Sequence, residues 1–282
     1  MPFNIPSSTL LRFFILLISV IFNHSAVADM DELYHLSIGT NLERYDSEFS
    51  IDASNSSNGT SIDFEDDLGY DSRARTLWIS AWYRVGDLHR LRMTYTPLNR
   101  SAQASTTKDI TINDTIVKAG ANFSASTETD VLDFSYIYSF YKSPQLEMGM
   151  SAGLYWLSNK TTFSAAGEIQ APGEDQPSFK SDYFSEQKIQ APMPLFGISA
   201  IYEITPDWRT HTALRYLSVQ LNDIDGRIAS AEFGAEYYFS DNWGAGMSLN
   251  FFDLKVDVDN LLTNSSLGWG HNGIQIYATF KY

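Results

Sequence analysis

The last nine residues, Ile274-Gln275-Ile276-Tyr277-Ala278-Thr279-Phe280-Lys281-Tyr282, decide the fold. Apolar residues occupy every second position, and a more polar set lies between them. A period of two predicts a β-strand with one apolar and one polar face. This strand runs to Tyr282 itself, which is aromatic.

An aromatic last residue with apolar residues at alternate positions before it resembles the C-terminal signal of Gram-negative outer-membrane β-barrel proteins. In that class the barrel assembly machinery recognises the last strand. The resemblance therefore implies this machinery as a partner, through the strand that ends at Tyr282. It also implies outer-membrane lipid and lipopolysaccharide as the surroundings of the barrel.

The first 28 residues have the plan of a secretory signal peptide. Arg12 precedes a short apolar stretch from Phe13 to Phe22, and Ala26-Val27-Ala28 forms an A-x-A site. The stretch has roughly ten residues, whereas a membrane-spanning helix needs about twenty. We expect cleavage after Ala28, with residues 29–282 forming one barrel domain that is exported to the outer membrane.

Composition narrows the class of protein. The chain has no cysteine, which excludes a lipid anchor on cysteine and any disulfide. Its formal net charge of −15 argues against nucleic acid as a partner. Aromatic residues make up 14% of the chain, yet no apolar run after Phe22 is long enough for a spanning helix. These features favour a transmembrane barrel, in which alternate residues meet lipid, over a soluble β-sandwich.

Alternating segments recur along the whole mature chain. We count ten candidate strands, at about 33–46, 72–85, 88–102, 125–141, 145–159, 188–204, 207–221, 226–240, 242–258 and 274–282. Eight or twelve strands are the alternatives, because residues 103–124 suit either strand extensions or a further hairpin. An open sheet edge in lipid would leave backbone groups unpaired, so the last strand should pair with the first. The predicted fold is all-β, a closed antiparallel up-and-down transmembrane β-barrel.

The connections alternate in length. Short turns are expected at Gly86-Asp87, Lys142-Ser143-Pro144, Thr205-Pro206-Asp207 and Ser240-Asp241-Asn242, which contain turn-forming residues. Longer polar segments lie near 47–71, 103–124, 160–187 and 259–270. This alternation is typical of periplasmic turns and extracellular loops in bacterial barrels. The segment Asp67-Leu68-Gly69, with Tyr83-Arg84 and His89-Arg90-Leu91 after it, resembles small outer-membrane barrels of the OmpA-, OmpW- and omptin-like size class and indicates no activity.

Charged residues on the polar faces should point into the barrel. A barrel of about eight strands is just filled by its own side chains, so ten strands favour a salt-bridged plug over an open channel. The alternative to a plug is a narrow, porin-like pore through the barrel. The predicted interior charge network comprises Arg84, Arg90, Arg92, Asp133, Glu147, Arg209, Arg215, Glu232 and Glu236, with His211 and Lys281 on the same faces.

Aromatic residues near strand ends suggest interfacial belts at the two membrane surfaces. The expected belt residues are Trp78, Trp82, Tyr141, Trp156, Trp208, Trp243 and Tyr282.

A barrel hydrolase is the alternative function. Omptin-type proteases and lipid A-modifying enzymes use similar barrels, and a His near a carboxylate can activate water. His271 begins the last strand, and Asp257 and Asp259 end the one before it. Because no second carboxylate pair is evident, we expect a non-enzymatic barrel with a structural, surface-interaction or minor-pore role. No motif indicates a cofactor, and the acidic segment 63–71 does not have the spacing of a calcium loop.

Overall fold

The computed structural model describes residues 30–282 apart from 54–59, 68, 106–108, 113–114, 171–175, 177, 222–223 and 260–262. The predicted signal peptide lies outside the described residues. No helix in the described part of the chain is long and apolar enough to cross a membrane.

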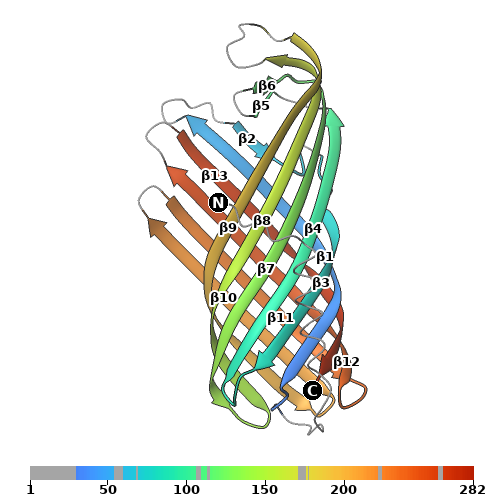
Figure 1. The fold of residues 1–282 in the computed structure, drawn as a ribbon, viewed down its shortest axis with the longest axis vertical. Helices are drawn as coiled ribbons and strands as arrows, with labels where there is room; N and C mark the ends of the chain where they lie inside the picture. The colour runs from blue at the N-terminus through green and yellow to red at the C-terminus, as the bar shows by residue number, and fades with distance from the viewer. Residues whose placement is uncertain are drawn as a thin grey trace.

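Ten long strands and three short ones make up the described structure (Figure 1). The short ones are β2 (Thr60–Asp63), β5 (Ile110–Ile112) and β6 (Thr115–Val117). The long ones are β1 (Tyr34–Ala53), β3 (Arg73–Arg84), β4 (His89–Ser105), β7 (Asn122–Lys142), β8 (Leu146–Gln170), β9 (Ser178–Thr205), β10 (Trp208–Leu221), β11 (Ile224–Tyr238), β12 (Trp243–Asp259) and β13 (Thr263–Lys281).

The long strands close into a barrel. Each one pairs antiparallel with the next along the chain, and β13 pairs with β1 from Ala53↔Thr263 to His35↔Lys281. The Tyr282 N–H donates to the Tyr34 carbonyl at 2.9 Å, and the Leu33 and Tyr34 N–H groups donate back to the Tyr282 carbonyl. The predicted fold class and the count of ten barrel strands are confirmed.

The two ends of the barrel differ. Tight turns join the strands at one end, where the C-terminus also lies, and we call this the short-turn end (Figure 1). At the other, long-strand end, β8 and β9 rise well beyond the other strands (Figure 1). The turn after β3 uses Gly86 at φ 87°, a left-handed conformation that glycine adopts without steric cost.

All four of the longer predicted loops contain strand residues. Much of 160–187 belongs to β8 and β9, which pair with each other up to Ile169↔Ser178. Residues 263–270 belong to β13, and β1 continues to Ala53. Residues 103–124 contain extensions of β4 and β7 and also the small β5–β6 hairpin. The β8 extension is polar on its outer face and carries Phe163, Ala165 and Ile169 on its inner face, so it lacks the apolar outer face by which the lipid-facing strands were recognised.

The wall is not continuous between β9 and β10. Their ladder runs from Thr205↔Trp208 to Phe196↔Tyr216 and ends there. Beyond that point the described pairing joins β9 only to β8 and β10 only to β11. Residues 178–195 of β9 therefore have one open edge, and Figure 1 shows the two strands diverging.

Two prolines mark this edge. Pro192 and Pro194 lie on β9 just beyond the last rung shared with β10. Proline has no N–H to donate and occurs in sheets almost only on edge strands. The sequence thus removes two donors from the strand where its partner departs.

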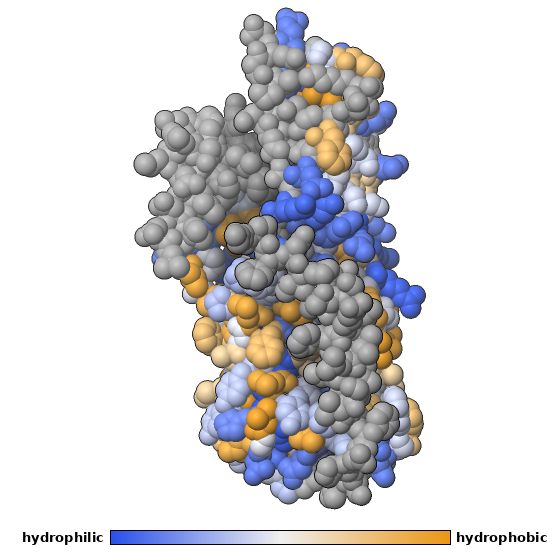
Figure 2. Space-filling model, viewed as in Figure 1, coloured by the Kyte–Doolittle hydropathy of each residue, from blue (hydrophilic) through white to orange (hydrophobic). Residues whose placement is uncertain are grey.

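Apolar side chains cover the outer surface of the half nearest to the short turns. Figure 2 shows them on the lower half of the visible face, with hydrophilic residues above them and at the bottom. This band is what a lipid-facing wall requires. Exposed members include Ile38, Phe134, Met150, Phe196, Ile198, Tyr216, Phe233, Met247 and Ile276.

The predicted aromatic belt agrees with the structure only in part. Trp208 and Trp243 are exposed beside short turns, as predicted. Trp78 is buried inside the barrel, and Trp82 stacks on the inward-facing His35 with ring centres 5.3 Å apart. Both tryptophans share the inward phase of Ser80 on β3, so the alternation itself contradicts placing them at the lipid interface.

Candidate functional site

Charged side chains fill the barrel interior near the short turns. The side chain of Glu147 is 0% exposed. Arg84 donates to both of its carboxylate oxygens, at 3.1 and 2.8 Å. Arg90 Nε lies 3.3 Å from Glu147 Oε1, and the Ser139 hydroxyl donates a further hydrogen bond. One carboxylate therefore ties together side chains of β3, β4, β7 and β8.

Residues that precede β1 close this end. Met30 is buried, and its carbonyl accepts a hydrogen bond of 2.7 Å from Arg84 Nη2. Glu32 is also buried and accepts a hydrogen bond from Arg209. Arg209 donates from its other terminal nitrogen to Glu203 at 2.6 Å. The short-turn end is thus sealed by ion pairs that include the chain before the first strand.

Arg209 also sets the protonation of Glu32. Burial alone would raise the pKa of this carboxyl, but the charge and hydrogen bond of Arg209 outweigh burial and hold the pKa below its ordinary value of 4.5. The unfolded chain then binds a proton more readily than the folded one. The contribution of Glu32 to stability is complete above about pH 4.5 and is lost as the pH falls through the lowered pKa.

We expect Glu32→Gln to reduce the free energy of unfolding at pH 7 and to have a diminishing effect under acid. The measurement is urea unfolding of both proteins in detergent micelles between pH 7 and pH 3. Asp31→Asn is the matched control, because Asp31 is exposed and makes only a surface contact with Lys142. If the loss of unfolding free energy caused by Glu32→Gln stays constant or grows as the pH falls, the lowered pKa of Glu32 is contradicted.

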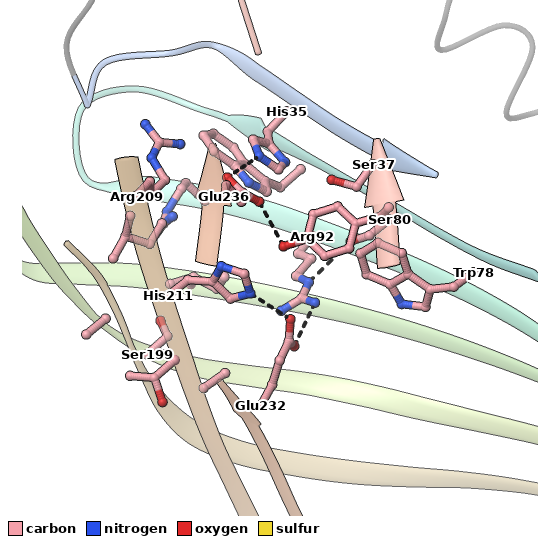
Figure 3. A pocket seen from close by; sticks show the side chains of 18 residues that line it. His35, Ser37, Trp78, Ser80, Arg92, Ser199, Arg209, His211, Glu232 and Glu236 are labelled. Atoms are coloured by element: carbon pink, nitrogen blue, oxygen red, sulfur yellow. Dashed lines mark hydrogen bonds and ion pairs between the residues drawn. The ribbon is translucent and has the colours of Figure 1, made fainter. Parts of the chain in front are cut away.

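The middle of the interior holds a cavity of about 80 Å³ (Figure 3). Arg92 Nη2 donates to Glu232 Oε2 at 3.0 Å, and His211 Nε2 lies 3.2 Å from Glu232 Oε1. Figure 3 shows these three side chains meeting across the lumen from β4, β10 and β11. The polar groups of these side chains line the small cavity.

A second carboxylate, Glu236, lies next to this cavity. His35 Nε2 is 3.4 Å from its Oε2, and the Tyr238 hydroxyl donates to the same oxygen at 2.6 Å. The Tyr277 hydroxyl donates to Oε1 at 3.2 Å. Both oxygens are therefore satisfied within the protein.

A third group of polar contacts lies toward the long-strand end. Asp133 accepts hydrogen bonds from Arg215 and from Ser135, the latter at 2.7 Å. Glu43 accepts from the Tyr45 hydroxyl at 2.5 Å and lies 3.3 Å from His271 Nδ1. The interior is thus crossed by paired charges at three successive levels.

The structure places His271 and Asp257, two of the three candidate catalytic residues, on opposite faces of the wall. His271 faces the lumen, where its carboxylate neighbour is Glu43. Asp257 lies in the outward phase of β12 and contacts Lys255 at 3.3 Å. Asp259 pairs in register with Asn264, away from His271. His271 and Asp257 thus lie in opposite phases of adjacent strands.

All nine residues of the predicted interior network lie in these levels. Eight pairings join them to one another or to other interior groups, and these are Arg84–Glu147, Arg90–Glu147, Arg92–Glu232, His211–Glu232, Arg209–Glu32, Arg209–Glu203, Arg215–Asp133 and His35–Glu236.

The sequence does not predict several of the interior charged groups. Glu32 precedes the first strand, so no periodicity marks it. Glu43 and His35 do lie in the inward phase of β1, and counting through its polar face would have found them. Glu65 comes from the segment after β2 and reaches Arg100 of β4, a contact that no strand pattern encodes.

The acidic segment 63–71 has a structural use. Asp63 Oδ1 accepts from the Asp66 N–H at 2.7 Å, and Asp67 Oδ2 accepts from the Asp63 N–H at 2.9 Å. Two of the acids thus cap their own turn. Among the described residues, no group of three or more His, Asp or Glu side chains is placed to hold a metal ion.

A larger cavity, of about 200 Å³, lies in the lumen toward the long-strand end. Its exposed surface is mostly apolar, and two charged residues of the wall, Glu48 of β1 and Arg100 of β4, also line it. We call it the outer chamber. Its apolar lining residues are Phe64, Tyr70, Leu98, Leu157, Phe163, Leu254, Leu267 and Trp269.

Comparison with solved structures identifies the architecture. The outer membrane protease OmpT from Escherichia coli matches with a TM-score of 0.52 and 11% identity, over 92% of this chain and 99% of the protease. The translocator domain of the autotransporter NalP from Neisseria meningitidis matches with a TM-score of 0.43 and 12% identity, over 95% and 94% of the two chains. OprG from Pseudomonas aeruginosa matches with a TM-score of 0.34 and 11% identity, over 91% and 99%.

The protein thus has the fold of an outer-membrane β-barrel. At these identities the likeness concerns fold alone. No protein-family model and no curated protein matches the sequence.

Proposed function

We propose that this protein is a non-conducting barrel of the Gram-negative outer membrane, with a structural or surface-interaction role. The observation that carries the proposal is the series of paired charges across the lumen at three levels. Buried charges must be paired or hydrated, and here the pairing partners are other wall side chains. A solute crossing the lumen would have to break each level in turn.

The orientation follows from the two ends. The short-turn end suits the periplasm, and the long-strand end, with its polar extensions, suits the cell exterior. Outer-membrane lipid and lipopolysaccharide then surround the apolar band. The β1–β13 seam, which ends at Tyr282, is the feature by which the assembly machinery would recognise the chain.

A hydrolase receives less support. His271 is paired with Glu43 inside the lumen, and the Tyr45 hydroxyl donates to the same carboxylate. A general base must reach a substrate-bound water. These groups are instead engaged with one another beneath the apolar lining of the outer chamber.

We expect the purified full chain to give no ion-conducting steps in planar lipid bilayers. The double variant Arg92→Ala, Glu232→Ala removes a complete ion pair from the middle cavity and leaves His211 free to be neutral. We expect this variant to show small, brief conductance events, because an ion then has two closed levels to break instead of three.

The matched control is Arg227→Ala, Asp253→Ala. It removes a pair with an N–O distance of 3.1 Å between exposed side chains on the outer face of β11 and β12. It should remain silent. Steady conductance by the unaltered protein at the level of the lumen variant would refute the closed barrel and favour a narrow pore.

A further inference from the structure

Three arginines form a group on the outer face of the wall. Arg44 of β1 pairs in register with Arg73 of β3, and Arg75 lies two residues further along β3. All three are exposed and lie in the outward phase of their strands. Positions related in this way are roughly 5–7 Å apart, so one ligand can reach all three side chains. We call this group the arginine cluster.

The arginine cluster lies at the edge of the apolar band. The next outward residues toward the short turns are Leu42 and Leu77, which are 44% and 46% exposed. In the opposite direction, two exposed acids, Asp46 and Asp71, come next along the two strands. The arginines are therefore the first charged groups beyond the apolar surface on β1 and β3.

The arginine cluster also differs from the other cations of the surface. Each of the others whose side chain the structure describes lies within 3.3 Å of a carboxylate oxygen, and these are Lys118, Lys142, Lys160, Lys188, Arg227 and Lys255. No described carboxylate forms such a pair with the three arginines. The side-chain hydrogen bond of the cluster runs from Arg75 Nε to Thr40 Oγ1, at 3.4 Å.

Such an arrangement is unfavourable without a counter-charge. Like charges directly opposite each other destabilise a sheet, and Arg44 is directly opposite Arg73. A phosphate group would supply the missing charge, because a guanidinium donates two parallel hydrogen bonds to phosphate oxygens. In a membrane lipid, the phosphate lies just beyond the acyl chains. The position of the arginine cluster next to the apolar band therefore favours a lipid phosphate over one in solution.

We propose that the arginine cluster binds the phosphorylated sugar headgroup of lipopolysaccharide, while the acyl chains of that lipid lie on the apolar band. This inference rests on the proposed direction of the long-strand end toward the cell exterior, where lipopolysaccharide forms the outer leaflet. A phosphate monoester carries about −1.5 to −2 charges at pH 7, so three cations match two phosphates better than one. Lipid A, the anchor of lipopolysaccharide, carries two.

Native mass spectrometry of the full chain in non-ionic detergent micelles measures lipid binding directly. The probes are lipid A with both phosphates, monophosphoryl lipid A with the same acyl chains, and phosphatidylglycerol, an anionic lipid without a phosphorylated sugar. We expect one tightly bound lipid A, weaker binding of the monophosphoryl form and the weakest binding of phosphatidylglycerol. Inorganic phosphate in large excess should not displace lipid A, because it has no acyl chains.

The triple variant Arg44→Gln, Arg73→Gln, Arg75→Gln removes the three charges and keeps polar side chains. Its affinity for lipid A should be lower by roughly a hundredfold, about fivefold for each cation beside an anionic lipid surface. The two forms of lipid A should then bind to this variant equally well.

The matched control is Lys160→Gln, Lys188→Gln, Arg227→Gln. It removes the same number of surface charges, but from ion pairs with Glu186 and Asp253. It should bind lipid A as the unaltered protein does. Migration of both variants as the compact form on an unboiled gel checks that they are folded.

Three results would overturn the proposal. The first is lipid A bound no more tightly than phosphatidylglycerol by the unaltered protein. The second is an equal loss of affinity in the two triple variants, which would indicate a general effect of charge. The third is displacement of lipid A by inorganic phosphate.

The direction of the barrel is tested separately. The chain has no cysteine, so Glu168→Cys places a single thiol on the exposed face of the β8 extension. Labelling of intact cells by a membrane-impermeant maleimide is expected. If the thiol is not labelled although lipid A binds in micelles, the arginine cluster faces the periplasm and lipopolysaccharide is not its occupant. The conductance experiment on the closed lumen is independent of both results.

Discussion

Replacing Glu147 by alanine is expected to lower the free energy of unfolding by about 3–5 kcal/mol, the usual cost of removing one partner of a buried ion pair. The loss is large because this carboxylate neutralises two arginines at once, Arg84 and Arg90. Both guanidinium groups are buried, and the variant leaves their charges facing each other. Urea unfolding in detergent micelles, followed by tryptophan fluorescence, measures the change.

Glu168→Ala is the matched control. It lies on the same strand, β8, but its side chain is exposed and belongs to the extension beyond the membrane. A change of less than about 0.5 kcal/mol is expected there, as for most surface positions. If the two variants unfold at the same urea concentration, the buried pairing at the short-turn end contributes little to stability.

The sequence predicts the membrane-spanning part of this fold well because lipid imposes a strict rule there. Every second side chain must be apolar, as in the run from Ala229 to Tyr237 on β11. Outside the lipid this alternation of apolar side chains is not required. The upper part of β8 is polar on its outer face and pairs with β9 up to Ile169↔Ser178, and this pairing is not contained in the pattern of a single strand.

The sequence predicts which charged residues face the interior but not which of them pair with one another. Phase along a strand identifies which residues face inward, and Arg92 and Glu232 were found in this way. Which charges meet depends on the tilt and stagger of strands around the barrel, which no local pattern fixes. For this reason His271 meets Glu43 of β1 and not an acid of β12.

The outer chamber could not be predicted from the sequence, for a further reason. Its walls combine inward positions of several strands with Phe64 and Tyr70, which lie between β2 and β3 and belong to no barrel strand. Arg100 was not recognised because its partners Glu65 and Asp71 come from this same inserted segment.

Gly39→Val is expected to prevent closure of the barrel. Gly39 lies in register with Trp78 on β3 and with Tyr277 on β13, and these two rings meet with centres 5.1 Å apart. A Cβ at Gly39 would overlap the Ile276 carbonyl oxygen and crowd Tyr277 Cβ. Backbone at this seam cannot move away without breaking the β1–β13 ladder, so the cost should exceed the ~1–3 kcal/mol typical of an overpacked core.

Gly270→Val separates this effect from the general cost of valine for glycine. Gly270 is also at the β1–β13 seam, but a Cβ there would meet nothing closer than the Phe252 carbonyl oxygen at 3.6 Å, an ordinary contact. On an unboiled gel, Gly270→Val should migrate as the compact form and Gly39→Val as the unfolded one. A compact Gly39→Val would mean that the seam can relax. Because a barrel with one unpaired seam exposes two rows of backbone groups to lipid, loss of this seam should remove the folded state as a whole and not merely weaken one pair of strands.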